Sequence, residues 1–211
     1  MTTPTVECWF DYSSPFAYLG TTQVERVAAQ AGGQAVFRPF FLGALFKTIG
    51  SPVVPLEGFS QAKQQHVGAD LHRWADHWGV PFRFCSRFPL RTVEPLRLTL
   101  LVPDAARGPL VHAIMRACWV DDEDPTDRAV LGACLDRAGL DRALLDRTGE
   151  TKQALFDATS ALAARGGFGA PTFFVGDQLF WGQDRLLFVG KALGGWRPAA
   201  PGSTIGGEVA R

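Results

Sequence analysis

The hydrophobic pattern at the start of the chain predicts a strand followed by a helix. Residues 6–10 alternate and then run apolar, which is typical of a buried strand, and residues 11–14 interrupt the run. Pro15 suits the first position of a helix, because its missing N–H would have no partner there. The apolar positions that follow at roughly helical spacing are Phe16, Leu19, Val24 and Val27. Gly32-Gly33 then ends the predicted helix.

A second pattern near the other end predicts a hairpin and a last helix. Pro171 precedes the apolar run 172–175, a Gly-Asp turn follows, and residues 179–181 form the expected partner strand. The apolar spacing beyond this hairpin is helical, so Gln183 or Asp184 is expected to cap the last helix.

Helical patterns also fill most of the chain between these two ends. Their ranges are about 58–77, 110–120, 128–138 and 152–164. They predict one helical insertion, residues 43–166, between the second and third strands. Residues 1–42 and 167–196 then form the strand-containing domain, and the Gly/Pro/Ser-rich residues 197–211 a flexible tail.

Three smaller sequence features bear on this outline. The acidic run 121–124 is expected to begin a helix, where its charge favours the positive end of the helix dipole, rather than to bind a ligand. Lys+Arg and Asp+Glu are equal at 21 each, which argues against nucleic acid or an anionic membrane as the main partner. Without a membrane-length apolar run or a signal-like N-terminus, a cytoplasmic protein is expected.

The cysteines argue against thiol–disulfide exchange. Cys8, Cys85, Cys118 and Cys134 contain no C-x-x-C pair, and residues 14–17, at the predicted turn from strand to helix, read Ser-Pro-Phe-Ala and carry no thiol. Cys8 is expected to pack in the first strand as a small apolar residue. Cys85, in a loop-like stretch, is the cysteine to test as an exposed reactive thiol.

Metal and serine-hydrolase chemistry find little support in the sequence. His66, His72 and His77 lie on one predicted helix, but His72 points away from the face that the other two share. No Cys, His and carboxylate grouping has zinc spacing, so we expect no metal site. Ser14 has no sequence-local base, which a nucleophilic hydroxyl needs.

Ser14 nevertheless occupies a position with two interpretations. It precedes Pro15, so it is the expected N-cap of the first helix, and capping alone would explain it. The hydroxyl and the first backbone N–H groups of the helix are also suited to hold an anion, and a thiolate is the anion that this geometry favours. The spacing leaves both interpretations open.

Three sequence blocks carry a resemblance to a known family. They are FDYSSPFAYLG (10–20), DLHRWADHWGVPF (70–82) and FGAPTFFVGDQLFWGQDRL (168–186). In this order they resemble the glutathione-dependent 2-hydroxychromene-2-carboxylate isomerases, relatives of kappa-class glutathione transferases in the DsbA-like branch of the thioredoxin superfamily. The resemblance implies an α/β, thioredoxin-like (DsbA-like) fold with a large all-helical insertion.

The resemblance also implies residue roles in glutathione binding. Ser14 matches the family serine that hydrogen-bonds the glutathione sulfur. Ala170 matches the residue before the family cis-proline, here Pro171, and its backbone would pair with that of glutathione. Gln183 and Asp184 match the pair that receives the γ-glutamyl end.

Outside these blocks the match is partial. Lys63 falls on a lysine common in the family and would meet a carboxylate of substrate or glutathione, although an exposed lysine is often only solvated. Many relatives carry an asparagine in the loop that is GSPVVPLEG (50–58) here, and an aromatic hydroxyl where this chain has His66. The missing asparagine leaves one expected polar contact to substrate or glutathione unassigned. His66 favours a different substrate or a different grip on its carboxylate.

The implied function is cis–trans isomerisation of 2-hydroxychromene-2-carboxylate and o-hydroxybenzylidenepyruvate, or of a related aromatic enone acid, by reversible addition of the glutathione thiolate. Members of the family are usually dimers, so a homodimer is expected. Two alternatives stay open, a kappa-like glutathione transferase or peroxidase and a non-catalytic thioredoxin-like binding module.

Overall fold

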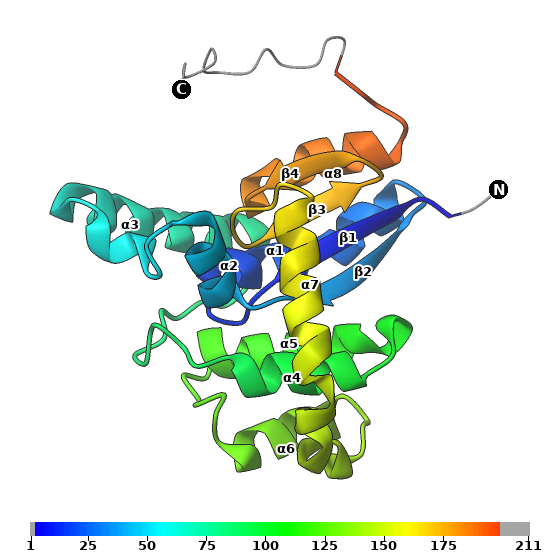
Figure 1. Ribbon diagram of the computed structural model, residues 1–211. Coiled ribbons are helices and arrows are strands. Elements are labelled where there is room, and N and C mark those ends of the chain that lie inside the picture. The colour runs from blue at the N-terminus through cyan, green and yellow to red at the C-terminus, as the bar shows by residue number, and fades with distance from the viewer. Residues whose placement is uncertain (1–2, 199–211) are drawn as a thin grey trace, which may run out of the picture.

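A four-stranded sheet forms the centre of the molecule in the computed structural model, which describes residues 3–198 (Figure 1). The strands are β1 (Thr5–Phe10), β2 (Gln34–Pro39), β3 (Thr172–Val175) and β4 (Gln178–Trp181). They lie in the order β2-β1-β3-β4, with β1 parallel to β2 and antiparallel to β3, and β3 antiparallel to β4. The strands predicted near the two ends of the chain therefore lie in one sheet, which confirms the α/β class.

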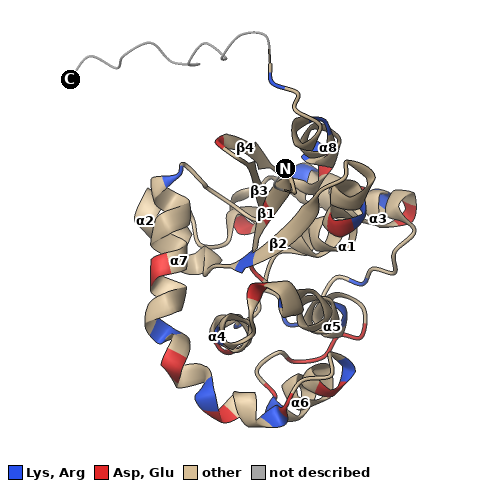
Figure 2. Cartoon of the chain, turned by 90° about the vertical axis from the view of Figure 1, so that its right-hand side faces the viewer, with Lys and Arg blue, Asp and Glu red and all other residues tan. Residues whose placement is uncertain are grey.

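Eight α-helices in the described residues surround this sheet. Their bounds are α1 (Pro15–Gln30), α2 (Leu42–Ile49), α3 (Gln61–Trp78), α4 (Val93–Leu101), α5 (Arg107–Trp119), α6 (Arg128–Arg137), α7 (Lys152–Ala164) and α8 (Leu186–Leu193). In Figure 2, α1 and α8 lie on one side of the sheet, α7 on the other, and α4, α5 and α6 below it. Short 3-10 helices are η1 (Pro55–Gly58), η2 (Asp104–Ala106), η3 (Arg142–Thr151) and η4 (Gln183–Arg185).

The centre of the core lies at β1. Val6, Cys8 and Phe10 point to the same face of the sheet and are fully buried. Trp9 on the other face is buried, while Glu7 there is half-buried. Cys8 pairs in register with Phe37 of β2 and Phe173 of β3. Its thiol therefore packs as a small apolar group, as predicted, and burial raises its pKa.

The segment between β2 and β3 consists of helices α2 to α7, as the sequence predicts for the insertion. The pattern locates α3, α5, α6 and α7 to within a few residues but misses α2, α4 and η3. In α4 the buried positions include Pro95, Leu96, Leu98 and Thr99, so apolar residues surround much of the helix. Such a short, widely buried helix has no clear amphipathic stripe to detect.

The acidic run 121–124 does not begin a helix, which corrects the prediction. Helix α6 starts at Arg128, and its N-cap is Asp127, whose side chain accepts the Ala129 N–H at 2.8 Å. Asp122 instead lies in a loop at φ 57° and accepts the Ser86 N–H at 2.8 Å. The hydrogen bonds of this loop lower the pKa of Asp122 to about 2.

The last helix also begins differently from the prediction. Gln183 and Asp184 lie in the 3-10 helix η4, and α8 starts only at Leu186, with no side-chain cap. Of the predicted flexible tail, residues 199–211 lie outside the described residues. Within residues 3–198 we find no helix that is both long and apolar enough to cross a membrane.

Candidate active site

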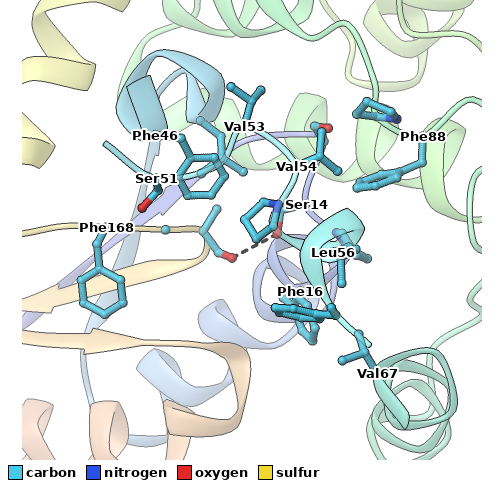
Figure 3. Close-up of a pocket in the computed structure, with 18 of the residues that line it drawn as sticks. Ser14, Phe16, Phe46, Ser51, Val53, Val54, Leu56, Val67, Phe88 and Phe168 are labelled. Carbon is cyan, nitrogen blue, oxygen red and sulfur yellow. Dashed lines mark hydrogen bonds between the residues drawn. The ribbon is translucent and has the colours of Figure 1, made fainter. Parts of the chain in front are cut away.

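A cleft of about 460 Å³ opens at the N-terminus of α1. Its lining comes from the 13–16 turn, from α2 and the loop after it, from α3, from Phe88-Pro89 and from the 168–170 segment. Figure 3 shows apolar side chains such as Phe46, Val53 and Phe88 around Ser14. The cleft thus lies between the strand-containing part and the inserted helices, and it can exclude water from an apolar ligand.

Ser14 connects the two sequence blocks from opposite ends of the chain. It is the N-cap of α1, and its Oγ accepts the Ala17 N–H at 3.1 Å. The same hydroxyl donates to the Ala170 carbonyl at 3.0 Å, a contact drawn as a dashed line in Figure 3. The Phe16 N–H, which no carbonyl within the helix can reach, adds a donor beside this hydroxyl. Ser14 is therefore a cap that also lies where an anion is favoured.

The peptide bond from Ala170 to Pro171 is cis, as the resemblance implies. A second cis bond joins Phe88 and Pro89, which the sequence does not predict. Both Ala170 and Phe88-Pro89 line the cleft.

Asp11 fixes the turn that presents the two serines. Its carboxylate is buried and accepts the Ser13 N–H at 2.9 Å and the Leu42 N–H at 2.8 Å, so it joins the turn to the start of α2. Burial raises the pKa of Asp11, while these N–H groups and the nearby Thr92 hydroxyl oppose that rise. The Asp11 carboxylate therefore positions the turn without lining the cleft.

The remaining residues of the turn are tied to the inserted helices. The Tyr12 hydroxyl lies 2.6 Å from Thr99 Oγ1, and the Tyr12 carbonyl accepts the Trp119 indole N–H at 2.8 Å. Ser13 Oγ accepts the Leu90 N–H at 3.1 Å. Every residue from 11 to 14 is thus bonded to a segment far away in the sequence.

The wall opposite this turn is the loop without the family asparagine. It contributes Ser51, Val53, Val54, Pro55 and Leu56 to the cleft, so the lining there is almost entirely apolar. Within the described residues, the hydrogen bonds of segment 51–60 all remain between residues 46 and 64. Among the described residues, no hydrogen bond joins this wall to the turn on the other side of the cleft.

Among the described residues that line the cleft, only Lys63 is charged. It lies in the first turn of α3, and its ammonium group is 3.6 Å from the centre of the Phe59 ring. The lysine is exposed, and the structure gives it no ion pair within residues 3–198. A carboxylate in the cleft would find its counter-charge here.

Gln183 and Asp184 do not line the same cleft. They border a neighbouring hollow of about 680 Å³ between α1, α3 and α8. Gln183 is only 2 % exposed, and its side-chain oxygen accepts the Trp78 indole N–H at 2.6 Å. Asp184 is exposed and pairs with Arg185 at 2.6 Å. The structure thus brings Ser14, Ala170 and Lys63 together, with Pro171 directly behind Ala170, but places this pair to one side.

Cys85 is not an exposed thiol, which corrects the sequence-based suggestion. Its side chain is 2 % exposed, and burial raises its pKa. His66 is exposed on α3 and does not line the cleft. Within residues 3–198 the structure contains no group of three His, Cys, Asp or Glu residues arranged to hold a metal ion.

Sequence reasoning missed several residues that shape the cleft. Asp11 lies inside the FDYSSPFAYLG block, and a lone acid between an apolar strand and a helix cap was a usable signal. Phe88, Pro89 and Phe168 come from loops without periodicity, so no local pattern reveals that they line the cleft.

Comparison with known proteins identifies similar chains along nearly the whole length. The family described as DSBA-like thioredoxin domain matches residues 5–194. The chain is 32% identical over 194 residues to a 2-hydroxychromene-2-carboxylate isomerase of Sphingobium xenophagum, covering 89% of this chain and 96% of the relative. It is 25% identical over 215 residues to glutathione S-transferase kappa 2 of Caenorhabditis elegans, covering 86% of this chain and 88% of the relative.

A solved structure supports the same fold. The structure of a 2-hydroxychromene-2-carboxylate isomerase superposes with a TM-score of 0.79 at 25% identity and covers 90% of this chain and 94% of its own. The predicted thioredoxin-like, DsbA-like fold is therefore confirmed.

Proposed function

This chain belongs to the DSBA-like thioredoxin domain family and, within it, to the family of the 2-hydroxychromene-2-carboxylate isomerases, and from this premise we propose that it is a glutathione-dependent isomerase. The proposed substrate is 2-hydroxychromene-2-carboxylate, its ring-opened form o-hydroxybenzylidenepyruvate, or a related aromatic enone acid. The observation that carries the proposal is the place of Ser14, at the N-terminus of α1, in an apolar cleft and bonded to Ala170.

The residues around Ser14 fit a peptide thiol. When bound, glutathione would supply a thiolate that adds reversibly to the conjugated carbon of the substrate, so that the former double bond can rotate. The Ser14 hydroxyl and the α1 N-terminus favour a negative charge at that place and would lower the thiol pKa from its usual value of about 8.5. Ser14 acts in this proposal as a hydrogen-bond donor and not as a nucleophile.

The Ala170 carbonyl also determines where the Ser14 hydroxyl proton points. In the structure the hydroxyl proton of Ser14 is directed to the Ala170 carbonyl. A peptide backbone that pairs with Ala170 competes for this carbonyl and would free the Ser14 proton to turn towards sulfur. Backbone recognition at Ala170, beside Pro171, and thiolate stabilisation at Ser14 are therefore coupled in the proposed site.

The family resemblance assigns the γ-glutamyl end of glutathione to Gln183 and Asp184. Because the side-chain oxygen of Gln183 is already bonded to Trp78, we propose that Gln183 positions η4 against α3. The Asp184 carboxylate is exposed and could receive the γ-glutamyl amine by exchanging its partner Arg185. Both residues border the neighbouring hollow, to one side of the cleft.

Lys63 and the apolar walls favour an aromatic acid as the second substrate. The lysine would bind its carboxylate, while Phe46, Val53 and Phe88 would surround the ring. Without the loop asparagine, this grip falls to Lys63. A homodimer and a cytoplasmic location stay predictions.

Calorimetric titration with glutathione tests the cofactor first. Saturable binding that prefers glutathione over S-methylglutathione is expected, because only the free thiol can ionise beside Ser14. Interconversion of the chromene and benzylidenepyruvate acids should then depend on glutathione without consuming it. No binding at millimolar glutathione would contradict the proposal and favour a non-catalytic binding module.

The kappa-class relative supports a second candidate function. A transferase or peroxidase would use the same thiolate at Ser14 but would consume glutathione. Stoichiometric loss of glutathione with an electrophilic arene or a hydroperoxide, without isomerisation of the chromene acid, would favour this alternative.

A further inference from the structure

The two adjacent serines of the cleft have opposite hydrogen-bonding roles. Ser14 uses its own proton, which it donates to the Ala170 carbonyl at 3.0 Å. Ser13 only accepts, because its Oγ receives the Leu90 N–H at 3.1 Å. Among residues 3–198 the structure gives the Ser13 hydroxyl proton no acceptor. Of the two hydroxyl protons at the α1 N-terminus, the one free to bind a ligand therefore belongs to Ser13.

Ser13 is also held in place at its backbone N–H and at its hydroxyl oxygen. Its backbone N–H donates to the buried Asp11 carboxylate at 2.9 Å, and the Leu90 N–H fixes one lone pair of its hydroxyl oxygen. Leu90 directly follows Phe88-Pro89, which line the cleft together with Ser13. Ser13 Oγ thus lies against the Phe88-Pro89 loop, whereas Ser14 Oγ lies against Ala170.

This separation divides the polar groups of the cleft between two ligands. The Ala170 side is where a peptide thiol would pair with the backbone, and Ser14 belongs to that side. The Phe88-Pro89 side is apolar and aromatic, so it suits the ring of the second substrate. We propose that Ser13 is a further catalytic residue, whose hydroxyl donates a hydrogen bond to the keto oxygen of the aromatic enone acid; this inference rests on the proposed function.

The chemistry of an enone explains why a donor is useful there. When a nucleophile adds to the conjugated carbon, the electron pair of the C=C bond moves towards the keto oxygen, which becomes negative. When the new bond breaks, the pair returns and the double bond re-forms, so no oxidant and no net proton are needed. A fixed hydroxyl at that oxygen stabilises the charged state more than the neutral one and therefore accelerates the reaction.

Kinetics of two Ser13 variants test the assignment. Ser13→Ala should lower kcat by between tenfold and a hundredfold, with the affinity for glutathione unchanged within twofold. Ser13→Thr keeps a hydroxyl and should recover most of this loss. The control is Ser160→Ala, which removes an exposed hydroxyl from α7, outside the cleft lining, and should leave kcat unchanged within twofold.

A binding measurement separates this role from a structural one. Benzylidenepyruvate, titrated in the presence of S-methylglutathione, probes the keto oxygen without reaction. Ser13→Ala should weaken its binding at least fivefold, whereas a variant that only loosens the Leu90 contact would lower the melting temperature and the affinity for glutathione as well.

The outcomes keep the two proposals apart. If the wild-type protein isomerises the substrate and Ser13→Ala retains full kcat and full affinity for benzylidenepyruvate, the Ser13 assignment is wrong and the proposed function stands. If Ser13→Thr is as impaired as Ser13→Ala, the hydroxyl is not the active group and the assignment fails. If the wild-type protein binds no glutathione and shows no turnover, the proposed function is wrong and the Ser13 assignment falls with it.

Discussion

The two walls of the cleft are built in different ways. On one side, residues 11–14 are bonded to Leu42, Leu90, Trp119 and Ala170, all of them distant in the sequence. On the other side, the hydrogen bonds of segment 51–60 within residues 3–198 all stay between residues 46 and 64, and Val53 is 63% exposed. The first wall suits chemistry that needs donors at fixed positions, and the second suits a surface that adapts to the substrate.

The largest expected effect is at the fixed wall. Ser14→Ala removes the hydroxyl proposed to stabilise the thiolate, so kcat should fall by a factor of about 10²–10³, or about 2.7–4 kcal/mol, and the pKa of bound glutathione should rise. Steady-state kinetics and ultraviolet titration of the bound thiol measure both quantities. Full turnover with an unchanged thiol pKa in this variant would refute the role of Ser14.

The buried acid of the same wall predicts an effect of pH on stability. Because burial raises the pKa of Asp11, the folded chain binds this proton more tightly than the unfolded chain, whose Asp pKa is about 3.9. The contribution of Asp11 to the free energy of unfolding is therefore greatest below about pH 3.9 and is lost as pH rises through the folded pKa.

Asp11→Asn should remove this slope, which amounts to at most about 1.4 kcal/mol per pH unit. Urea unfolding at a series of pH values between 4 and 7 measures it. Asp76→Asn, on the exposed side of α3, is the matched control and should keep the slope of the wild type. Equal slopes for wild type and Asp11→Asn would show that this carboxyl does not titrate abnormally.

A smaller effect is expected at the charged residue near the adaptable wall. Lys63→Gln should raise the KM for the aromatic acid about fivefold or less, because an exposed ion pair is weak, and should leave kcat unchanged. High salt should shrink the difference. Lys47→Gln, at the end of α2 and outside the cleft lining, provides the control. Equal KM values for both variants would mean that Lys63 is only solvated.

The smallest effect on stability is expected at the adaptable wall itself. Val53→Ala should change the free energy of unfolding by less than about 0.5 kcal/mol, since this side chain is mostly exposed. The same substitution at fully buried Val24 should cost about 1.5–3 kcal/mol. A loss at Val53 as large as the loss at Val24 would show that segment 51–60 is packed as firmly as the core.

The sequence predicts the fold well wherever local pattern and tertiary environment agree. Strands β1 and β3 and helices α6 and α7 have regular apolar spacing and clear ends, and the structure places them nearly as predicted. The pattern misses helix α4 because its buried positions surround the helix axis. It misassigns the acidic run because Asp122 lies in a loop and accepts a hydrogen bond from the Ser86 N–H.

The sequence predicts the site only in part, because several of its contacts join residues that are far apart in the chain. Ser14 and Ala170 lie within short motifs, so the sequence identifies them, and the structure brings them together. The cap assigned to Gln183 or Asp184 failed because a 3-10 turn delays the start of α8. Which serine has a free proton depends on Leu90, and no local pattern predicts a partner that is 77 residues away.

The span of the contact between Ser14 and Ala170, 156 residues, also has a consequence for biosynthesis. The ribosome synthesises the chain from its N-terminus, so the 11–14 turn emerges long before Ala170, whose carbonyl accepts the Ser14 hydrogen bond. Loops of this length close late and slowly in folding. A nascent chain that stops short of Ala170 therefore exposes the serine motif without the carbonyl that pairs with it, and the proposed thiol site would form only after Ala170 has been synthesised.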